Sequence, residues 1–314
     1  MRDWTEISWR DHLRWVEVEG RPANVLEIGE GPPLVFVHGL SGSWQNWLLN
    51  IPAFMDSHRV IAMDLPGFGA SPMPRERITI SAYGRWLDAL LSSLGVEAAA
   101  VVGNSMGGFI AAETAIKFPS RVERLVLVSA AGITVEKQRD DRILRVLEAT
   151  ENVGQFLLAR VLSKSDALVA RPRGRKALMW FVAAHPDRLD PRIVKEQMAG
   201  ANTPGFVQAL DALTSYPIRD RLSEIGCPTW LCWGPKDLLV PVRDAHVFDE
   251  LIPDSRLTIY EDTGHVPMLE QPERFNSDLR AFLAEQPPSH PEREEGAATA
   301  RSPEPAEVEA EELA

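Results

Sequence analysis

Short, continuous apolar runs recur along the N-terminal part of the chain, and several are separated by segments with helical spacing. A run that is apolar at every position predicts a strand buried on both faces, as in a parallel sheet. Residues 80–94 have the apolar spacing of a helix, which Gly95 ends. Strands separated by helices indicate parallel crossovers in a doubly wound sheet. We predict eight strands, at residues 13–18, 23–28, 34–37, 60–63, 98–102, 125–128, 229–233 and 257–260, the first two as an antiparallel hairpin at the sheet edge.

The alternation of strands and helices stops between residues 135 and 216, where the apolar spacing is helical throughout. A long helical insertion in such a sheet is expected to cap the C-terminal ends of the strands, where sites in this architecture lie. The predicted fold class is therefore α/β: a doubly wound, mostly parallel, eight-stranded sheet with an inserted helical lid. We predict a core at residues 1–134 and 217–285, and a lid at 135–216.

The acidity of the chain is concentrated near its C-terminus. The formal net charge is −12, and nine Glu against two Arg from Glu285 onward account for −7 of it. Residues 286–314 have few apolar side chains to bury, so we expect a disordered acidic tail. The remaining charge forms no basic patch, which argues against a nucleic-acid partner.

The sequence carries no sign of export or of a membrane span. Residues 1–6 are charged and lack an apolar signal segment, and no stretch approaches the roughly 20 apolar residues of a spanning helix. Cys227 flanks the predicted strand 229–233 and Cys232 lies within it. Five positions apart in this direction, their side chains should point to opposite faces, a poor geometry for a disulfide. We expect buried thiols and a cytoplasmic location.

A Gly-x-Ser-x-Gly motif at residues 103–107 lies between a predicted strand and a predicted helix. A serine on a tight strand-to-helix turn exposes its hydroxyl above the sheet. Gly103 and Gly107 allow the strand and the helix to close around that turn, and the helix N-terminus offers N–H groups to an oxyanion. We predict that Ser105 is a nucleophile.

A serine hydroxyl needs a base, usually a histidine that a carboxylate orients. Asp237 follows one predicted strand and His265 follows the next, in the order Ser, Asp, His that accompanies this motif. A single helix separates the two strands, so a βαβ unit brings both residues to the edge where the Ser105 turn opens. Among the competitors, we interpret His38 and Asp64 as loop-shaping residues, and Asp262 as a solvated carboxylate.

These motifs, from His38-Gly39 to residues 265–267, resemble those of the α/β-hydrolase fold superfamily, and the likeness in sheet pattern covers about residues 13–284. The resemblance implies an oxyanion hole made by the backbone N–H groups of Leu40 and Met106. Serine rather than aspartate at the turn disfavours epoxide hydrolases and haloalkane dehalogenases, which attack carbon with a carboxylate. We therefore expect a serine hydrolase that cleaves a carboxylic ester of a small or medium apolar substrate.

A second activity is suggested by Asn104. The elbow Gly-Asn-Ser-Met-Gly-Gly resembles that of hydrolases that cleave carbon–carbon bonds in 2-hydroxy-6-oxo-dienoates, although those relatives usually carry Trp where this chain has Val266. We assign Asn104, Val266, Trp180 and Phe181 to the substrate pocket, with packing of the lid helices as the alternative for the two aromatic residues.

Two further classes fit the same fold: an acyltransferase or perhydrolase, and a ligand receptor without turnover. The expected partner is a small molecule. No cofactor or metal is implied, because acidic and histidine residues do not cluster at ligand spacing. The oligomeric state is left open.

Overall fold

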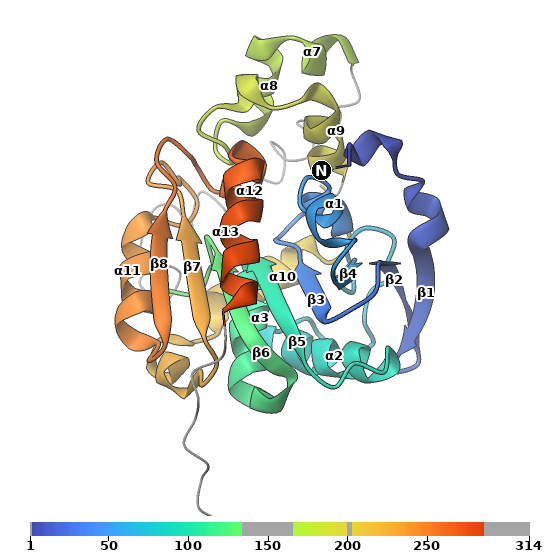
Figure 1. The fold of residues 1–314 in the computed structure, drawn as a ribbon, viewed down its shortest axis with the longest axis vertical. Coiled ribbons are helices and arrows are strands. Elements are labelled where there is room, and N and C mark those ends of the chain that lie inside the picture. Colours follow the sequence, from blue (N-terminus) through green and yellow to red (C-terminus); the bar gives the residue numbers. More distant parts are fainter. Residues whose placement is uncertain (1, 134–165, 200–202, 286–314) are drawn as a thin grey trace, which may run out of the picture. The chain divides into compact units, whose positions relative to one another are not determined.

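The computed structural model describes residues 2–133, 166–199 and 203–285. An eight-stranded sheet in the order β1-β2-β4-β3-β5-β6-β7-β8 forms its centre (Figure 1). The strands are β1 (Leu13–Val18), β2 (Arg21–Ile28), β3 (Pro33–Val37), β4 (Arg59–Met63), β5 (Ala99–Asn104), β6 (Val122–Val128), β7 (Thr229–Trp233) and β8 (Ser255–Ile259). The β1–β2 and β2–β4 pairs are antiparallel and the other five are parallel, which confirms the predicted fold class.

Helices lie on both faces of the sheet. The α-helices are α1 (Ile51–Phe54), α2 (Ile80–Ser93), α3 (Met106–Lys117), α7 (Asp166–Ala170), α8 (Pro172–Met179), α9 (Pro191–Ala199), α10 (Phe206–Ser215), α11 (Val242–Leu251), α12 (Pro267–Glu270) and α13 (Pro272–Ala284). The 3₁₀ helices are η1 (Trp4–Glu6), η2 (Trp9–His12), η3 (Trp44–Trp47), η4 (Pro119–Arg121), η6 (Pro186–Arg188) and η7 (Arg219–Glu224). None of the helices in the described ranges is long and apolar enough to span a bilayer.

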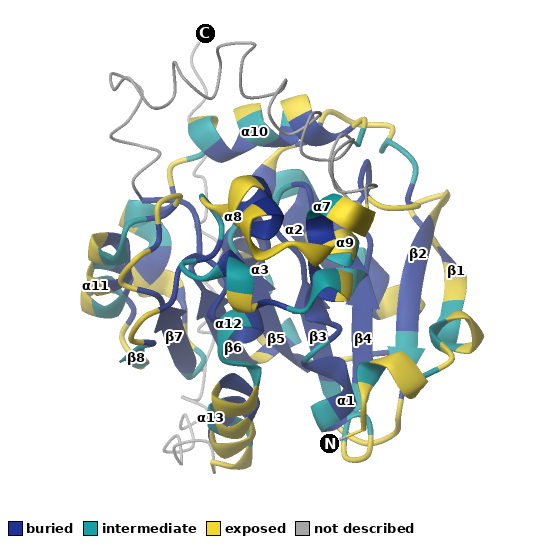
Figure 2. Ribbon diagram, turned by 90° about the horizontal axis from the view of Figure 1, so that it is seen from above, coloured by how far each residue is buried: buried dark blue, intermediate teal, exposed yellow. Residues whose placement is uncertain are grey.

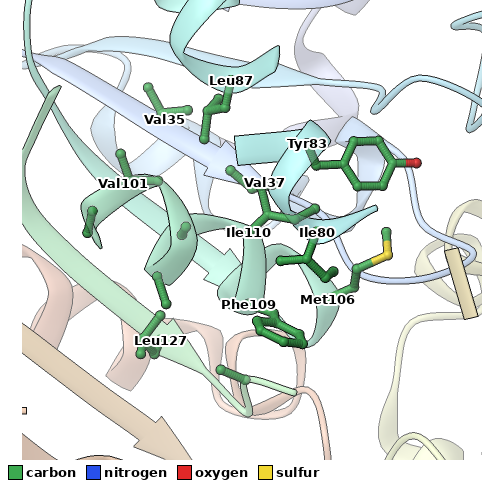
Figure 3. Packing of buried hydrophobic residues seen from close by; sticks show 14 of the residues in the cluster. Val35, Val37, Ile80, Tyr83, Leu87, Val101, Met106, Phe109, Ile110 and Leu127 are labelled. Carbon is green, nitrogen blue, oxygen red and sulfur yellow. The ribbon is translucent and has the colours of Figure 1, made fainter. Parts of the chain in front are cut away.

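The strands divide the apolar core in two because successive side chains along a strand point to opposite faces. In β3, Val35 and Val37 belong to the apolar layer that also contains residues of α2, α3 and α11, whereas Leu34 and Phe36 belong to the layer that contains residues of α1, α12 and α13. Figure 3 shows the first of these layers, in which Val35 and Val37 face the side chains of α2 and α3. The continuous apolar runs in the sequence thus correspond to strands covered on both sides, as Figure 2 shows for the central sheet.

The described part of the predicted lid is helical. Helices α7 to α10 lie between β6 and β7, and no strand occurs in residues 166–199 or 203–216. The earlier part of that segment, 134–165, and the predicted acidic tail, 286–314, lie outside the described residues. Both cysteines are free thiols; Cys232 is buried, and burial raises its pKa, whereas Cys227 is partly buried.

Candidate active site

Ser105 lies at the junction of β5 and α3 in a backbone conformation that is rare for a residue with a side chain. Its φ is 55° and its ψ is −118°. The Ser105 N–H donates to Val128 O at 2.9 Å, and its carbonyl accepts from the N–H groups of Phe109 and Ala131, each at 3.1 Å. Backbone strain of this kind persists only where the surrounding structure enforces it, and it clusters at functional sites.

The two glycines of the motif make this tight turn possible. A Cβ on Gly103 would lie 2.3 Å from Gly107 O, and one on Gly107 would lie 2.2 Å from Val37 O. Both contacts involve backbone atoms, so neither glycine could be replaced without moving the chain. The elbow therefore packs directly on β3, whose loop carries the predicted oxyanion-hole residue Leu40.

The structure brings Asp237 and His265 together. Asp237 Oδ2 lies 2.8 Å from His265 Nδ1, and the two side chains are 0% and 5% exposed. The other carboxylate oxygen, Oδ1, accepts from the N–H groups of Leu239 at 2.8 Å and Val240 at 2.9 Å. An acceptor at Oδ2 favours the His265 tautomer protonated on Nδ1, which leaves Nε2 able to accept a proton.

Asn104 connects the elbow to the loop of His265. Its side-chain Nδ2 donates to Val128 O at 3.0 Å and to His265 O at 3.2 Å. Both amide hydrogens of this buried residue are therefore directed at backbone carbonyls. Within the described residues, no hydrogen bond joins Ser105 Oγ to His265; such contacts are commonly long in a free enzyme and shorten when substrate binds.

His38 holds the loop after β3. Its Nε2 accepts from Leu65 N–H at 2.9 Å, so Nδ1 carries the proton and donates to Gly39 O at 2.7 Å. The ring is fully buried, and this burial lowers the pKa of His38. A neutral imidazole with both nitrogens engaged has no capacity left for catalysis.

Asp64 is also engaged within the protein. Its Oδ1 accepts from Trp44 N–H at 2.9 Å, and its Oδ2 accepts from Asn24 Nδ2 and Ala70 N–H, each at 2.8 Å. The carboxylate ties β2, the loop after β4 and the start of η3 together. Asp64 thus fixes the start of η3, which follows the loop of Leu40 along the chain.

The backbone N–H groups of Leu40 and Met106 point to no acceptor within the described part of the chain. Met106 is the first residue of α3, where an N–H has no partner in its own helix. Leu40 follows Gly39, and a Cβ on Gly39 would lie only 3.1 Å from Ser105 Cβ, so the loop approaches the nucleophile closely. Two unpaired donors next to Ser105 suit an oxyanion.

The remaining predicted pocket residues come from two segments that are in contact. Val182 O, next to Phe181, accepts from the His265 N–H at 2.8 Å. Trp180 is 57% exposed and packs edge-on against Phe181, with ring centroids 5.8 Å apart. Val266 is buried in the apolar layer that contains Leu34 and Phe36 of β3. Their contact with substrate stays a prediction.

Two acidic residues near His265 have contacts that the sequence did not reveal. Asp262, which we expected to be solvated, is half-exposed but binds the side chain of Lys236 and lies 2.8 Å from His185 Nε2. These partners, Lys236 first, hold the pKa of Asp262 well below its usual range. Glu270 accepts three backbone N–H groups around the same loop. The partners in the insertion, and Lys236, are remote in sequence from these two residues, so no local pattern indicates the contacts.

Two cavities of about 330 and 380 Å³ lie away from these residues. The first borders α2 and the β1–β2 hairpin, and the second lies between η1, η2 and α9. In the described part of the chain, no three His, Cys, Asp or Glu side chains are grouped to hold a metal.

Comparison with known proteins identifies the family. Residues 32–272 match the alpha/beta hydrolase fold, and the chain belongs to this family, as its resemblance suggested. An uncharacterized protein of Mycobacterium bovis is 31% identical, with 86% of this chain and 81% of the relative covered. The 2-hydroxy-6-oxo-6-phenylhexa-2,4-dienoate hydrolase of Comamonas testosteroni is 29% identical, with 82% of this chain and 89% of the relative covered. A solved structure of an N-acyl homoserine lactone degrading enzyme has 27% sequence identity and a TM-score of 0.70, with 86% of this chain and 100% of that chain covered.

Proposed function

We propose that this member of the hydrolase family cleaves a carboxylic ester of a small or medium apolar substrate through an acyl-enzyme. Ser105 attacks the carbonyl carbon while His265 Nε2 takes the hydroxyl proton. His265 then protonates the departing alcohol, and a water molecule, deprotonated by the same nitrogen, releases the acid and regenerates Ser105. Asp237 holds the imidazole tautomer and stabilises its charged form. The N–H groups of Leu40 and Met106 bind the oxyanion.

The observation that carries this proposal is the Asp237–His265 contact of 2.8 Å next to the strained Ser105 turn. Asn104 hydrogen-bonds the carbonyl of His265, so the nucleophile and the base belong to adjoining loops. Helices α7 to α10 would act as the lid over this edge, since Val182 O accepts from the His265 N–H. The lactone-degrading neighbour supports the choice of ester, because a lactone is a cyclic ester.

A fluorophosphonate probe tests the nucleophile. We expect peptide mass spectrometry to find the adduct on Ser105, and Ser105→Ala to lose both labelling and turnover of an aryl ester. Ser129 provides a matched control, because it also has a positive φ, of 48°, and follows the neighbouring strand β6. Ser129→Ala should keep labelling at Ser105. An adduct elsewhere, or full activity in Ser105→Ala, would refute the assignment.

Carbon–carbon cleavage of a 2-hydroxy-6-oxo-dienoate is the second candidate, favoured by the Comamonas relative and by Asn104. A dienoate hydrolase needs cationic or polar groups for the substrate carboxylate. The buried Arg175 of the insertion is engaged elsewhere: its Nη1 donates to Val169 O and Ala170 O, and its Nη2 to Asp187 O. Val266 also departs from the Trp usual in those enzymes.

We therefore expect kcat/KM for a short or medium-chain aryl ester to exceed that for a dienoate by at least about tenfold, or ~1.4 kcal/mol of transition-state stabilisation. Steady-state kinetics with both substrates on one preparation measure the ratio. Equal or greater activity on the dienoate would reverse the order of the two candidates. Loss of dienoate turnover alone in Asn104→Ala would then attribute that activity to Asn104.

A further inference from the structure

Glu270 binds two segments of the backbone with one carboxylate. It ends α12, five residues after His265, and is partly buried. Its Oε1 accepts from the Gly264 N–H at 2.6 Å, while its Oε2 accepts from the N–H groups of Ala184 at 2.9 Å and His185 at 3.0 Å. One side chain therefore joins the loop of the proposed base to a turn of the helical insertion.

The two joined segments are in direct backbone contact. We call residues 182–185 the insertion turn and residues 262–265 the base loop. The His265 N–H donates to Val182 O at 2.8 Å, and a Cβ on Gly264 would lie 2.8 Å from Ala184 N and 3.0 Å from Val182 O. No side chain separates the two segments at this point. A shift of the insertion turn consequently acts directly on the residue that carries the imidazole.

The chemistry of this contact requires a carboxylate. Three N–H donors converge on one side chain, and only an ionised carboxyl group offers two oxygens that both accept. A glutamine would turn its NH₂ group toward at least one N–H and leave that donor without an acceptor. Burial raises the pKa of Glu270, and the three donors oppose that rise because they favour the ionised form.

We propose that Glu270 is a positioning residue that couples the helical insertion to the base. By holding Gly264 and the insertion turn on its two oxygens, it fixes the backbone of His265 and so the reach of the imidazole toward Ser105. Its hydrogen bonds in the described residues are to backbone N–H groups, so we assign it no direct role at the reacting atoms. The inference rests on the proposed function for its kinetic consequence, whereas the coupling itself is a property of the described contacts.

A second link between the same segments lies closer to the surface. His185 Nε2 is 2.8 Å from Asp262 Oδ1, and Arg188 Nη1 is 3.3 Å from Asp262 Oδ2. These side chains are between 26% and 67% exposed, so water competes for the charges. The partly buried carboxylate of Glu270, with its three backbone donors, is therefore the contact that should dominate the coupling.

The kinetic test compares Glu270→Gln with Glu273→Gln, which makes the same change of charge at an exposed position three residues further on. In Glu270→Gln we expect kcat for an aryl ester to fall about 20-fold or more while KM changes less than about threefold, because the base is displaced and the acyl site is not. Labelling of Ser105 by a fluorophosphonate should slow by a similar factor. Glu273→Gln should match the wild type in all three quantities.

Hydrogen exchange measured by mass spectrometry tests the coupling without reference to activity. In Glu270→Gln, peptides that contain the insertion turn and the base loop should exchange faster together, although these segments are about 80 residues apart, while peptides from β5 and α3 should be unchanged. If the glutamine variant is too unstable to purify, Glu270→Asp serves in its place. The aspartate keeps the charge but is one methylene too short to reach both segments.

The possible failures can be told apart. A wild type that neither turns over esters nor labels at Ser105 would refute the proposed function, and the exchange experiment would still decide the coupling. An active wild type with Glu270→Gln within about threefold of Glu273→Gln would overturn the positioning role. Unchanged exchange in either segment would overturn the coupling.

Discussion

His265 and His38 both follow strands of the same sheet, both are buried, and both lie near an aspartate, yet their surroundings differ in one respect. Both ring nitrogens of His38 form hydrogen bonds with the backbone: Nδ1 donates to Gly39 O, and Nε2 accepts from the Leu65 N–H. Of the ring nitrogens of His265, only Nδ1 forms a hydrogen bond, to Asp237, and within the described residues no group is hydrogen-bonded to Nε2. A histidine that holds structure and one suited to proton transfer thus differ by a single uncommitted nitrogen.

The two aspartates differ in the same way. Asp64 receives three donors, from Trp44, Asn24 and Ala70, and all of them serve to fix loops. Asp237 uses one oxygen for two backbone N–H groups and keeps the other for the His265 ring. Burial and hydrogen bonding alone therefore do not distinguish a catalytic carboxylate from a structural one; the identity of the bonded donors does.

The largest expected effect separates the two aspartates by activity. Asp237→Asn should lower kcat for an aryl ester by about 10⁴, as for the triad acid of serine proteases, because an amide favours the wrong imidazole tautomer. Its melting temperature should stay close to that of the wild type, since the amide keeps the volume and one acceptor. Steady-state kinetics and thermal unfolding measure both quantities. A loss below about tenfold would remove Asp237 from the mechanism.

Asp64→Asn should show the opposite profile. An amide cannot accept from all three donors, so at least one buried N–H loses its partner and the free energy of unfolding falls by about 1–3 kcal/mol. Urea denaturation measures this change. Asp56→Asn is the control, because that side chain is 69% exposed and its ion pair with Arg2 lies at the surface. Equal stabilities for the two variants would show that the Asp64 network contributes nothing.

The buried His38 should also make the free energy of unfolding depend on pH. Burial lowers the pKa of His38 from its usual value of 6.5. Below pH 6.5 the unfolded chain then takes up a proton at this residue that the folded chain does not, so stability falls with falling pH, by at most about 1.4 kcal/mol per pH unit for one proton. The part of the unfolding free energy that depends on neutral His38 is fully present above about pH 6.5 and is lost as the pH falls below it.

We expect His38→Gln to reduce the slope of the unfolding free energy between pH 6.5 and 5, and His246→Gln, at an exposed helical position, to leave it unchanged. Urea titrations across this range provide the slopes. Identical slopes for wild type and His38→Gln would mean that residue 38 is not linked to folding through its proton.

The smallest expected effect concerns the third aspartate near a histidine. Asp262 lies 2.8 Å from His185 Nε2, but its side chain is 49% exposed. Solvent screens such a pair, so Asp262→Asn should keep kcat/KM within about threefold of the wild type. A loss comparable to that of Asp237→Asn would mean that the acid of the site has been misassigned.

The sequence was most informative where short-range patterns carry the physics. Continuous apolar runs predicted the strands at the centre of the sheet, since a strand buried on both faces needs apolar side chains at every position. The hairpin at the sheet edge was predicted instead from alternating positions and a turn. The Gly-x-Ser-x-Gly motif predicted a tight strand-to-helix turn at Ser105, and the structure has that turn, with Gly103 and Gly107 too close to backbone atoms to carry a side chain. Strand-end placement likewise predicted that Asp237 and His265 would meet, and they do, at 2.8 Å.

Only the tertiary structure decided how side chains and backbone groups remote in sequence are paired. Asn104, assigned to the substrate pocket from its motif, directs its amide to Val128 O and His265 O. Asp262, expected to be solvated, binds Lys236 and His185, and Glu270 binds the insertion turn. The physical reason is that these donors and acceptors belong mainly to backbone groups, which every residue carries. Their partners are therefore chosen by the packing of segments and leave no mark in the local sequence.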